Sequence, residues 1–242
     1  MSDVVFDVVV VGGGPVGACA ATLLARGGDR AGLNVALLEP RPPDAPAPGA
    51  PPDARVVALS RASERVLERA GAWAAIAGAR LSPYERMRIW HESVPSAGGD
   101  VLVFDAADVG EPNLGYIVEH RLLQAALLEA FTAAGGHLHT APFASLRITG
   151  ETVEVRTAAG PLLARLAVGA DGAQSALRAA AGLTAEVSDY RQSAIVASVA
   201  TARAHERTAW QRFMRRGTLA FLPLADGSSS IAPPISRSGR RT

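Results

Sequence analysis

The stretch that decides the fold is residues 6–39, FDVVVVGGGPVGACAATLLARGGDRAGLNVALLE. Phe6–Val11 is a short, nearly all-apolar, β-branched run, which predicts a strand buried on both faces. An Ala-rich segment from Ala18 to about Arg26 predicts a helix, and Val35–Leu38 predicts a second buried strand. We therefore expect an open, mostly parallel sheet in which these two strands are neighbours.

The turn between the first strand and the helix carries three spaced glycines. Gly12, Gly14 and Gly17 fit the pattern G-x-G-x-x-G directly after a strand and before a helix. The first allows a tight turn, the second lets a pyrophosphate approach the backbone, and the third lets helix and strand pack closely. Pro15 lies in the same turn, and the helix start offers N–H groups and partial positive charge to a diphosphate. The turn predicts a dinucleotide site; a glycine-rich turn in an unrelated α/β protein is the alternative.

An acidic residue follows the second strand. Glu39 comes about 20 residues after the last glycine, where a carboxylate can accept a hydrogen bond from a ribose 2′-OH. An acid at this place favours an unphosphorylated ribose, which indicates FAD or NAD rather than NADP at this site.

Composition excludes several classes of function. No apolar run approaches the roughly 20 residues needed to cross a bilayer, so we expect a cytoplasmic protein, with peripheral attachment to the inner membrane as a further option. Cys19 is the only cysteine, which excludes an internal disulfide or a multi-cysteine zinc site, and no metal site is predicted. The net charge of +1 gives no case for nucleic acid. We interpret the arginines after Arg203 as a solvated surface rather than a phosphate site.

The middle of the chain alternates between helical and strand patterns. Residues 40–54 are Pro/Ala-rich and predict a surface loop. Helical spacing over Arg61–Ala70 starts after Ser60, a suitable N-cap, and a short helical piece follows from Trp73 to Ala79. Period-two alternation over Met87–Phe104 predicts a β-hairpin. A short strand is predicted next at Leu114–Val118, followed by a helix from His120 to about Ala134.

Four strands with glycine turns are expected next, as a β-meander. They are His137–Pro142, Ser145–Ile148, Val153–Thr157 and Leu162–Val168. The last leads into Gly169-Ala170-Asp171-Gly172 and a short helix, which is a second geometry for meeting a phosphate or ribose. Further strands are predicted at Tyr190–Ala200, Trp210–Met214 and Thr218–Pro223.

These residues resemble the FAD-dependent aromatic hydroxylases related to para-hydroxybenzoate hydroxylase, and most closely the branch that hydroxylates ubiquinone precursors. Four stretches carry the resemblance: VVVVGGGPVGACAATLLA, DARVVALSRASERVLERAGAW, LGYIVEHRLLQAALLEA and VGADGAQSALR. FLPLADGSSSI resembles a strand of the family's substrate domain. The match runs from about residue 5 to residue 231.

The resemblance implies a set of FAD-binding residues. Gly12, Gly14, Pro15 and Gly17 would bind the pyrophosphate, and Glu39 the adenosine ribose. Arg41 would lie near the adenine. Arg55 would reach the flavin or its diphosphate, with a plain surface arginine as the alternative. Asp171 and Gly172 match the family's second motif at the ribityl and diphosphate region. Around His120 and Arg121 many members place an Arg, and some an Asn, against the cofactor; His120 occupies the closer register, and Arg121 is the predicted contact. No catalytic side chain is predicted, and His120 is expected to be structural.

The same resemblance implies the architecture. We expect an α/β fold with a Rossmann-like FAD-binding domain, a mostly parallel sheet plus β-meander, and an interleaved antiparallel-sheet substrate domain. Residues 1–80 and 111–186 would form the FAD-binding domain. Residues 81–110 and 187–231 would form the substrate domain, its second part incomplete, and 232–242 an irregular, poorly ordered tail.

The implied activity is hydroxylation of a small phenolic ring, a ubiquinone precursor with or without a prenyl tail, using FAD, NAD(P)H and O2. Association with a membrane surface or a biosynthetic complex is a further expectation. The family's third FAD motif, Gly-Asp-Ala-His followed by Pro and Gly-Gln-Gly, has no counterpart here. We therefore expect a C-terminally truncated chain that binds FAD weakly or not at all and hydroxylates nothing. The alternatives are an inactive flavoprotein fragment and an FAD- or NAD-linked oxidoreductase of another substrate class.

Overall fold

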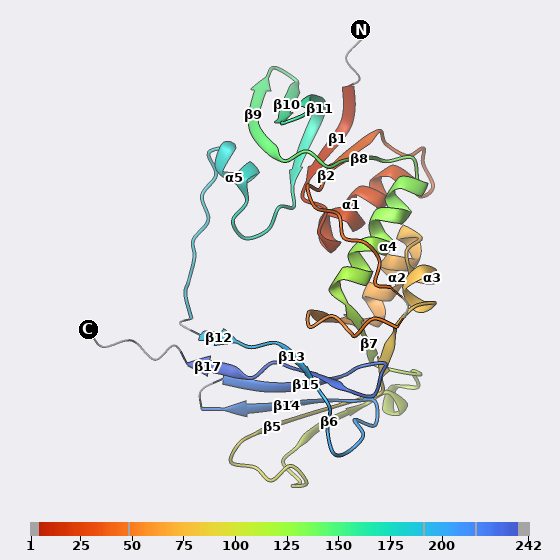
Figure 1. Cartoon of the computed structure of the whole chain (residues 1–242), viewed down its shortest axis with the longest axis vertical. Helices are drawn as coiled ribbons and strands as arrows, with labels where there is room; N and C mark the ends of the chain where they lie inside the picture. The colour runs from red at the N-terminus through yellow and green to blue at the C-terminus, as the bar shows by residue number, and fades with distance from the viewer. Residues whose placement is uncertain (1–4, 48, 191, 216, 237–242) are drawn as a thin grey trace, which may run out of the picture. The chain divides into compact units, whose positions relative to one another are not determined.

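The computed structural model describes residues 5–47, 49–190, 192–215 and 217–236. It divides into two compact units (Figure 1). The first unit consists of Met1–Pro46, Arg65–Ala75 and Arg121–Glu186. The second consists of Ala47–Glu64, Ile76–His120 and Val187–Thr242. The chain therefore passes back and forth between the units, as the interleaved domains predicted from the sequence require.

The first unit is built on a six-stranded sheet with the order β8-β2-β1-β11-β10-β9. Its strands are β1 Val5–Val11, β2 Val35–Leu38, β8 His137–His139, β9 Phe143–Thr149, β10 Thr152–Thr157 and β11 Gly160–Gly169. The strands β8, β2, β1 and β11 run parallel to one another. The prediction that Phe6–Val11 and Val35–Leu38 are parallel neighbours is confirmed.

The central strands are buried on both faces. Val9 and Val10 are fully buried although they point to opposite faces of β1, and all four residues of β2 are buried. One core cluster combines Phe6, Val9 and Leu38 with Val155 of the neighbouring hairpin and Leu177. Such two-sided burial is what the uninterrupted valine run predicts for a strand inside a parallel sheet.

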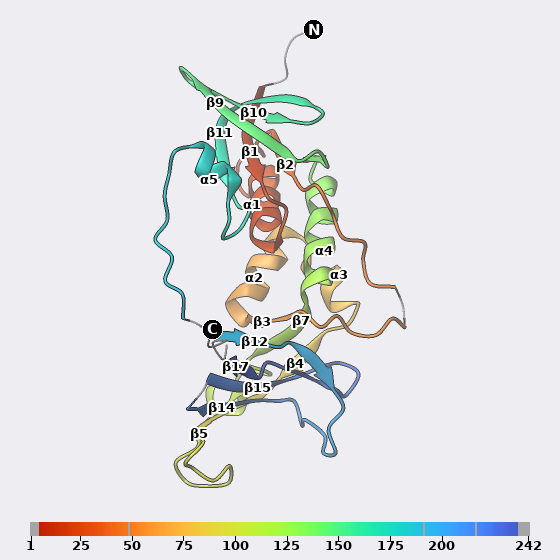
Figure 2. The same cartoon turned by 60° about the vertical axis from the view of Figure 1, so that its left-hand side comes forward.

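Among the described residues the β-meander consists of β9, β10 and β11, one strand fewer than predicted. Figure 2 shows these strands beside β1. The strands β9, β10 and β11 pair antiparallel. The first turn contains Gly150 as predicted, whereas the second lies at residues 158–159 and Gly160 already begins β11. His137–His139, expected as the first strand of the meander, instead pairs parallel with β2 as β8. The correction has a physical reason: a strand that follows a crossover helix returns to the sheet in the parallel sense.

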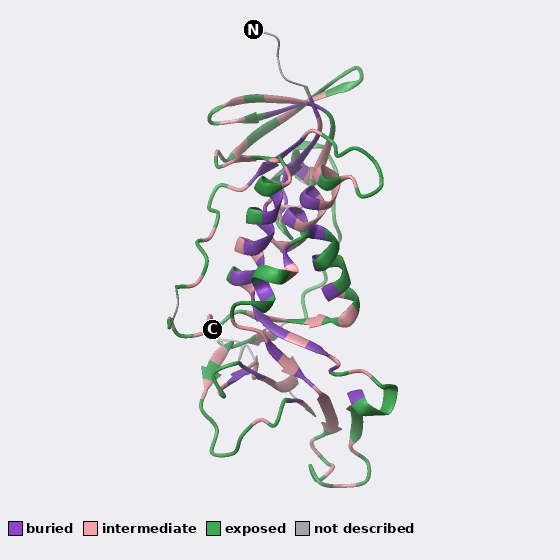
Figure 3. Ribbon diagram, turned by 90° about the vertical axis from the view of Figure 1, so that its right-hand side faces the viewer, coloured by how far each residue is buried: buried purple, intermediate pink, exposed green. Residues whose placement is uncertain are grey.

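Two helices of the first unit contact each other. They are α1 Pro15–Arg26 and α4 His120–Ala133, and both carry the buried faces that their apolar spacing predicts (Figure 3). The Thr22 hydroxyl donates to the Ala18 carbonyl at 2.7 Å and lies 3.3 Å from the Leu127 carbonyl of α4. The other helices of the described chain are short. They are α2 Arg61–Ala70, α3 Trp73–Ala77 and α5 Ala176–Ala180, and η1 Ala106–Val109 is a single 3-10 turn.

The second unit contains three sheets. A six-stranded sheet has the order β13-β16-β15-β14-β5-β6, a three-stranded sheet the order β3-β7-β4, and β12 pairs with β17. The strands are β3 Val56–Ser60, β4 Ser82–Tyr84, β5 Arg86–His91, β6 Leu102–Asp105, β7 Gly115–Glu119, β12 Gln192–Ala194, β13 Ala197–Val199, β14 Thr208–Met214, β15 Gly217–Pro223, β16 Ser229–Ile231 and β17 Pro234–Ser236. A core cluster of Tyr84, Ile117, Ala209 and Leu224 lies in this unit.

The larger sheet is antiparallel except at one pairing. The predicted hairpin is confirmed as β5 and β6, but β14 runs parallel to β5. The long connection between these strands lets the chain enter both from the same end, which a short hairpin loop cannot do. The three-stranded sheet was not predicted, because β4 has only three residues and contains a proline.

The end of the described chain also differs from the expectation. Residues 232–242 were predicted to be an irregular tail, but Pro234–Ser236 forms β17 and pairs antiparallel with β12. This segment can form the backbone hydrogen bonds of a strand although it is proline-rich, because Pro234 is the first residue of β17. Residues 237–242 lie outside the described residues.

The compact units and the predicted domains have different boundaries. Residues 47–64, 76–80 and 111–120 belong to the second unit, whereas the prediction assigned them to the FAD-binding domain. A compact unit is defined by contacts and a domain by function, so the domain ranges stay a prediction.

Alanine substitutions in the first turn test which glycines the packing of the protein itself requires. A Cβ at position 17 would lie 1.9 Å from the Gly12 carbonyl oxygen, whereas a Cβ at position 14 meets nothing within 4 Å. We expect Gly17→Ala to lower the free energy of unfolding by about 1–3 kcal/mol. Gly14→Ala is the matched control and should leave it nearly unchanged. Urea unfolding of both variants measures this, and equal stabilities would contradict the packing.

Candidate dinucleotide site

Three sequence signals meet at one edge of the parallel sheet. Val11 is level with Leu38 of β2 on one side and with Gly169 of β11 on the other. The glycine turn, Glu39 and the Gly169–Gly172 turn therefore follow three adjacent strands at their carboxyl ends. Backbone hydrogen bonds fix the junction, from Gly12 N to Leu38 O at 2.9 Å and from Ala170 N to Val11 O at 2.7 Å. Open α/β sheets bind ligands at this edge.

The three glycines of the first turn have different reasons to be glycine. Gly12 has a φ of +103°, and a Cβ there would lie 2.4 Å from the Ala170 carbonyl oxygen. Gly17 packs against the Gly12 carbonyl. Gly14 has an ordinary φ of −59° and open space beside it. The protein itself does not require glycine at position 14, which fits a backbone surface kept bare for a ligand.

The start of α1 is open to an anion. Gly14 is its N-cap and supplies no side-chain hydrogen bond, and the first turn contains no acidic residue. Pro15 has no N–H to leave unpaired, so the available donors are those of the following residues. Val16 beside them is 80% exposed. The uncapped N–H groups and the positive end of the helix fit a diphosphate.

Glu39 is held by backbone N–H groups on both sides of its carboxylate. Gly13 N donates to Oε2 at 3.0 Å, and Arg41 N donates to Oε1 at 3.0 Å. A Cβ at Gly13 would lie 2.5 Å from the Glu39 Cβ. Glu39 can therefore approach the turn this closely only because residue 13 is a glycine. The carboxylate is thereby fixed against the glycine turn, with lone pairs remaining on both oxygens.

Gln124 of α4 joins this group and was not predicted. Its Nε2 donates to Gly13 O at 2.9 Å and lies 3.5 Å from Glu39 Oε2. The signal available in the sequence was a polar residue on an apolar helix face, since Leu127 and Leu128 on the same side are buried. The pattern does not indicate that Gln124 bonds Gly13, because these residues are 111 positions apart in the sequence.

The second turn is organised by its acid. The Asp171 carboxylate accepts from Ser175 Oγ and from Leu177 N, the latter at 3.1 Å. Ser175 Oγ accepts from Arg178 N at 2.9 Å and caps α5. Partial burial raises the pKa of Asp171, but these hydrogen bonds outweigh it and hold the pKa below its usual range. Gly172 is exposed, with a φ of +87°. The carboxylate stabilises the turn; its predicted cofactor contact stays a prediction.

The three predicted arginines lie in different surroundings. The exposed side chain of Arg41 belongs to the first unit, as does Arg121, whose Nε donates to the Asp44 carbonyl at 2.9 Å. Arg55 belongs to the second unit, where its N–H donates to Asp53 Oδ1 at 3.1 Å and its carbonyl accepts from His120 N at 2.9 Å. Burial and then the charge of Arg55 lower the pKa of His120, against the opposing charge of Asp53. The structure gathers the other predicted residues in the first unit.

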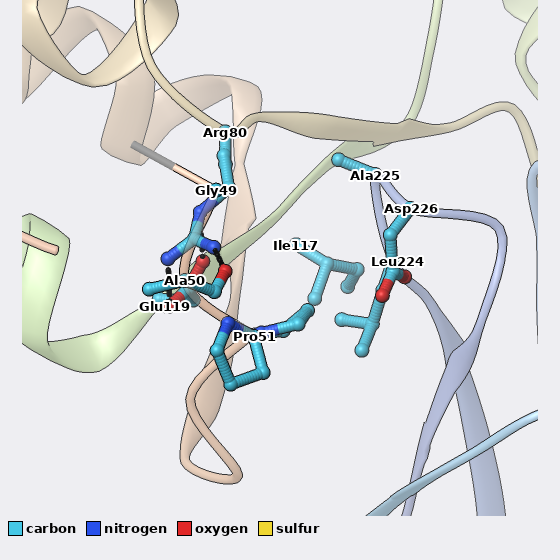
Figure 4. Close-up of a pocket in the computed structure, with 10 residues that line it drawn as sticks. Gly49, Ala50, Pro51, Arg80, Ile117, Glu119, Leu224, Ala225 and Asp226 are labelled. Atoms are coloured by element: carbon cyan, nitrogen blue, oxygen red, sulfur yellow. Dashed lines mark hydrogen bonds and ion pairs between the residues drawn. The ribbon is translucent and has the colours of Figure 1, made fainter. Parts of the chain in front are cut away.

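The second unit contains a small cavity of about 320 Å³ (Figure 4). Its polar centre is the ion pair between Arg80 and Glu119, with Nε to Oε1 at 2.9 Å and Nη2 to Oε2 at 3.0 Å. Glu119 is buried and also accepts from Asp53 N at 2.8 Å. Arg80 donates further to the Ala50 carbonyl. These groups satisfy one another and hold the 50–53 segment to β7, so the charges of Arg80 and Glu119 are already paired.

The parallel sheet, the glycine turn and the open helix start define an α/β protein of the dinucleotide-binding class. The chain belongs to the FAD binding domain family, whose members it matches over residues 5–232. FAD is therefore its cofactor type, as the sequence predicts, and the residues at the sheet edge fit the diphosphate. No helix among the described residues is long and apolar enough to span a membrane.

The curated relatives have names from ubiquinone biosynthesis. The 3-demethoxyubiquinol 3-hydroxylase of Escherichia coli (strain K12) is 34% identical over 235 residues, covering 93% of this chain and 56% of the relative. The ubiquinone hydroxylase UbiL of Rhodospirillum rubrum is 33% identical, covering 95% of this chain and 52% of the relative. The chain thus spans about half the length of the curated relatives it matches.

Solved structures support the fold. The p-nitrophenol 4-monooxygenase PnpA of Pseudomonas putida matches with a TM-score of 0.75 at 19% identity, covering 99% of this chain and 60% of that protein. PqsL, a probable FAD-dependent monooxygenase of Pseudomonas aeruginosa, matches with a TM-score of 0.74 at 22% identity, covering 96% and 61%. The predicted family resemblance and fold class are confirmed.

Two substitutions test whether the sheet edge binds FAD. Gly14→Val places a side chain in the open space beside the turn and should abolish FAD binding without disturbing the protein's own contacts. Glu39→Ala should weaken binding by about 1.5–3 kcal/mol if the charged carboxylate bonds the ribose. Quenching of FAD fluorescence measures both dissociation constants. Unchanged FAD affinity in both variants would remove this site from consideration.

The second turn has a pH-dependent contribution to stability. Because the folded-state pKa of Asp171 is lowered, its stabilisation is present above the unfolded pKa near 4 and is lost as pH falls through the folded value. We expect Asp171→Ala to cost about 1–3 kcal/mol at pH 7, since Ser175 and Leu177 lose their acceptor. The difference from the unsubstituted chain should shrink below about pH 4. Urea unfolding across pH 7 to 3 measures it, and a pH-independent difference would contradict this role.

Proposed function

We propose that the protein is an FAD-dependent monooxygenase that hydroxylates an aromatic ring of the ubiquinone-precursor type, with NAD(P)H and O2 as co-substrates. The observation that carries the proposal is the family match over residues 5–232 together with relatives named as ubiquinone hydroxylases. The glycine turn and the open start of α1 support it, because they supply the anion-binding surface that an FAD enzyme needs.

The chain's own residues bind and orient the cofactor in this proposal. The N–H groups after Gly14 receive the diphosphate, and Glu39 accepts a ribose hydroxyl with its remaining lone pairs. Arg41, Arg55, Arg121, Asp171 and Gly172 are proposed as further cofactor contacts. Bound FAD supplies the redox and oxygen chemistry. No side chain is assigned a catalytic step. The predicted prenyl tail, membrane-surface association and complex partners remain part of the proposal.

Turnover distinguishes the proposal from its alternatives. The chain is supplied with FAD, NADH or NADPH, air and a 2-polyprenylphenol, beside a chimera that continues it with the C-terminal part of the Escherichia coli relative. From the chimera we expect phenol-stimulated NAD(P)H oxidation and a product heavier by one oxygen, detected by mass spectrometry.

The same comparison tests the prediction that the 242-residue chain alone binds FAD weakly and hydroxylates nothing. Oxygenated product from either protein supports the proposed function. NAD(P)H oxidation with no oxygenated product from either would contradict it and favour another FAD- or NAD-linked oxidoreductase. Loss of bound FAD from both would favour an inactive flavoprotein fragment.

A further inference from the structure

We propose that Gln124 is a positioning residue of the FAD site, whose carboxamide ties the glycine turn and Glu39 together in the conformation that receives the cofactor. The inference rests on the proposed location of the FAD site and names a residue that the sequence did not assign. It stands on three groups of the first unit: the Gly13 backbone, the Glu39 carboxylate and the Gln124 amide.

Gly13 depends on side chains for both of its backbone hydrogen bonds. Its N–H donates to Glu39 Oε2 at 3.0 Å, and its carbonyl accepts from Gln124 Nε2 at 2.9 Å. Gly13 is buried, so a lost partner is poorly replaced by water. The middle of the glycine turn is therefore held from two sides, by the end of β2 and by α4. The adjacent Gly14, which faces open space, takes its position from this anchored residue.

The chemistry of the position requires a donor. Both neighbours of Gln124 Nε2, the Gly13 carbonyl and Glu39 Oε2, are acceptors. The amide must present its NH2 group to them, because the opposite orientation would bring three acceptors together. A carboxylate at position 124 would do the same and would add repulsion with Glu39. A side chain with two N–H donors matches the two acceptors.

The helix does not need Gln124 for its own packing. Leu123, Leu127 and Phe131 of α4 are buried, and Thr22 of α1 contacts the Leu127 carbonyl. Gln124 is only half-buried. Apolar contacts therefore hold α4 against the unit, which leaves the carboxamide to act on the turn. This separation makes a test possible in which binding changes and folding does not.

The test replaces the donor and follows FAD affinity against pH. Gln124→Glu should weaken FAD binding about tenfold at pH 8, where the introduced carboxyl is ionised. The Glu39 carboxylate beside it raises the pKa of the introduced carboxyl. Part of the affinity should therefore return as pH falls toward 5, because the protonated carboxyl then donates one hydrogen bond. Gln124→Met should weaken binding at every pH with no such recovery. Each substitution is made in the 242-residue chain and in the chimera with the Escherichia coli relative, so that an FAD dissociation constant is obtained even where the chain alone binds weakly. The dissociation constants come from FAD fluorescence quenching, with urea unfolding of the ligand-free variants in parallel.

Two controls separate the outcomes. Glu129→Gln makes the opposite charge change at an exposed position of the same helix and should leave the FAD dissociation constant unchanged. Gly14→Val tests the location of the FAD site itself. If this variant binds FAD as tightly as the unsubstituted chain, FAD binds elsewhere, and the inference about Gln124 is wrong as well. If Gly14→Val abolishes binding while both Gln124 variants bind normally, the positioning role alone is wrong. Loss of affinity in Gln124→Glu without recovery at low pH, matched by a loss of ligand-free stability, would show a merely structural role and also overturn it.

Discussion

The structure depends on how closely the first turn approaches the end of β11. Position 12 has no room for a Cβ beside the Ala170 carbonyl, and position 17 has none beside the Gly12 carbonyl. These two contacts bring α1 onto the sheet and align the ends of β1 and β11 in the parallel ladder. The Gly169–Gly172 turn and the start of α1 consequently share one edge. A larger residue at either glycine would separate the elements that this edge combines.

Three carboxylates in this protein hold irregular backbone segments in place. Glu39 accepts from two backbone N–H groups at the first turn, Asp171 accepts from the start of α5, and Glu119 accepts from the loop before β3. In each case an irregular segment leaves an N–H group without a helix or sheet partner, and a carboxylate supplies the acceptor. For Glu39 and Asp171 this role accompanies the proposed cofactor role, because a fixed carboxylate is also oriented for a ligand.

The charges around the first turn give the proposed diphosphate site a defined position. The open helix start attracts negative charge, while Glu39 stands beside the turn and repels it. A diphosphate is favoured at one side of the turn and a hydroxyl-bearing group at the other, which matches a dinucleotide whose adenosine ribose carries no 2′-phosphate. Gln124 bonds Gly13 in the turn that separates these two regions.

The sequence by itself determined the βαβ unit, the parallel neighbours and the family, because the valine run, the glycine spacing and the strand-end acid depend on residues near one another in the chain. It also determined that Gly12 and Gly17 matter, although the structure shows that, of the three spaced glycines, only Gly14 has open space beside it. Tertiary structure alone decided that β8 pairs with β2, that β14 runs parallel to β5, and that Gln124 bonds Gly13. Those pairings join residues far apart in the sequence, and the local pattern of an amide or a short strand contains no information on which distant backbone completes its hydrogen bonds.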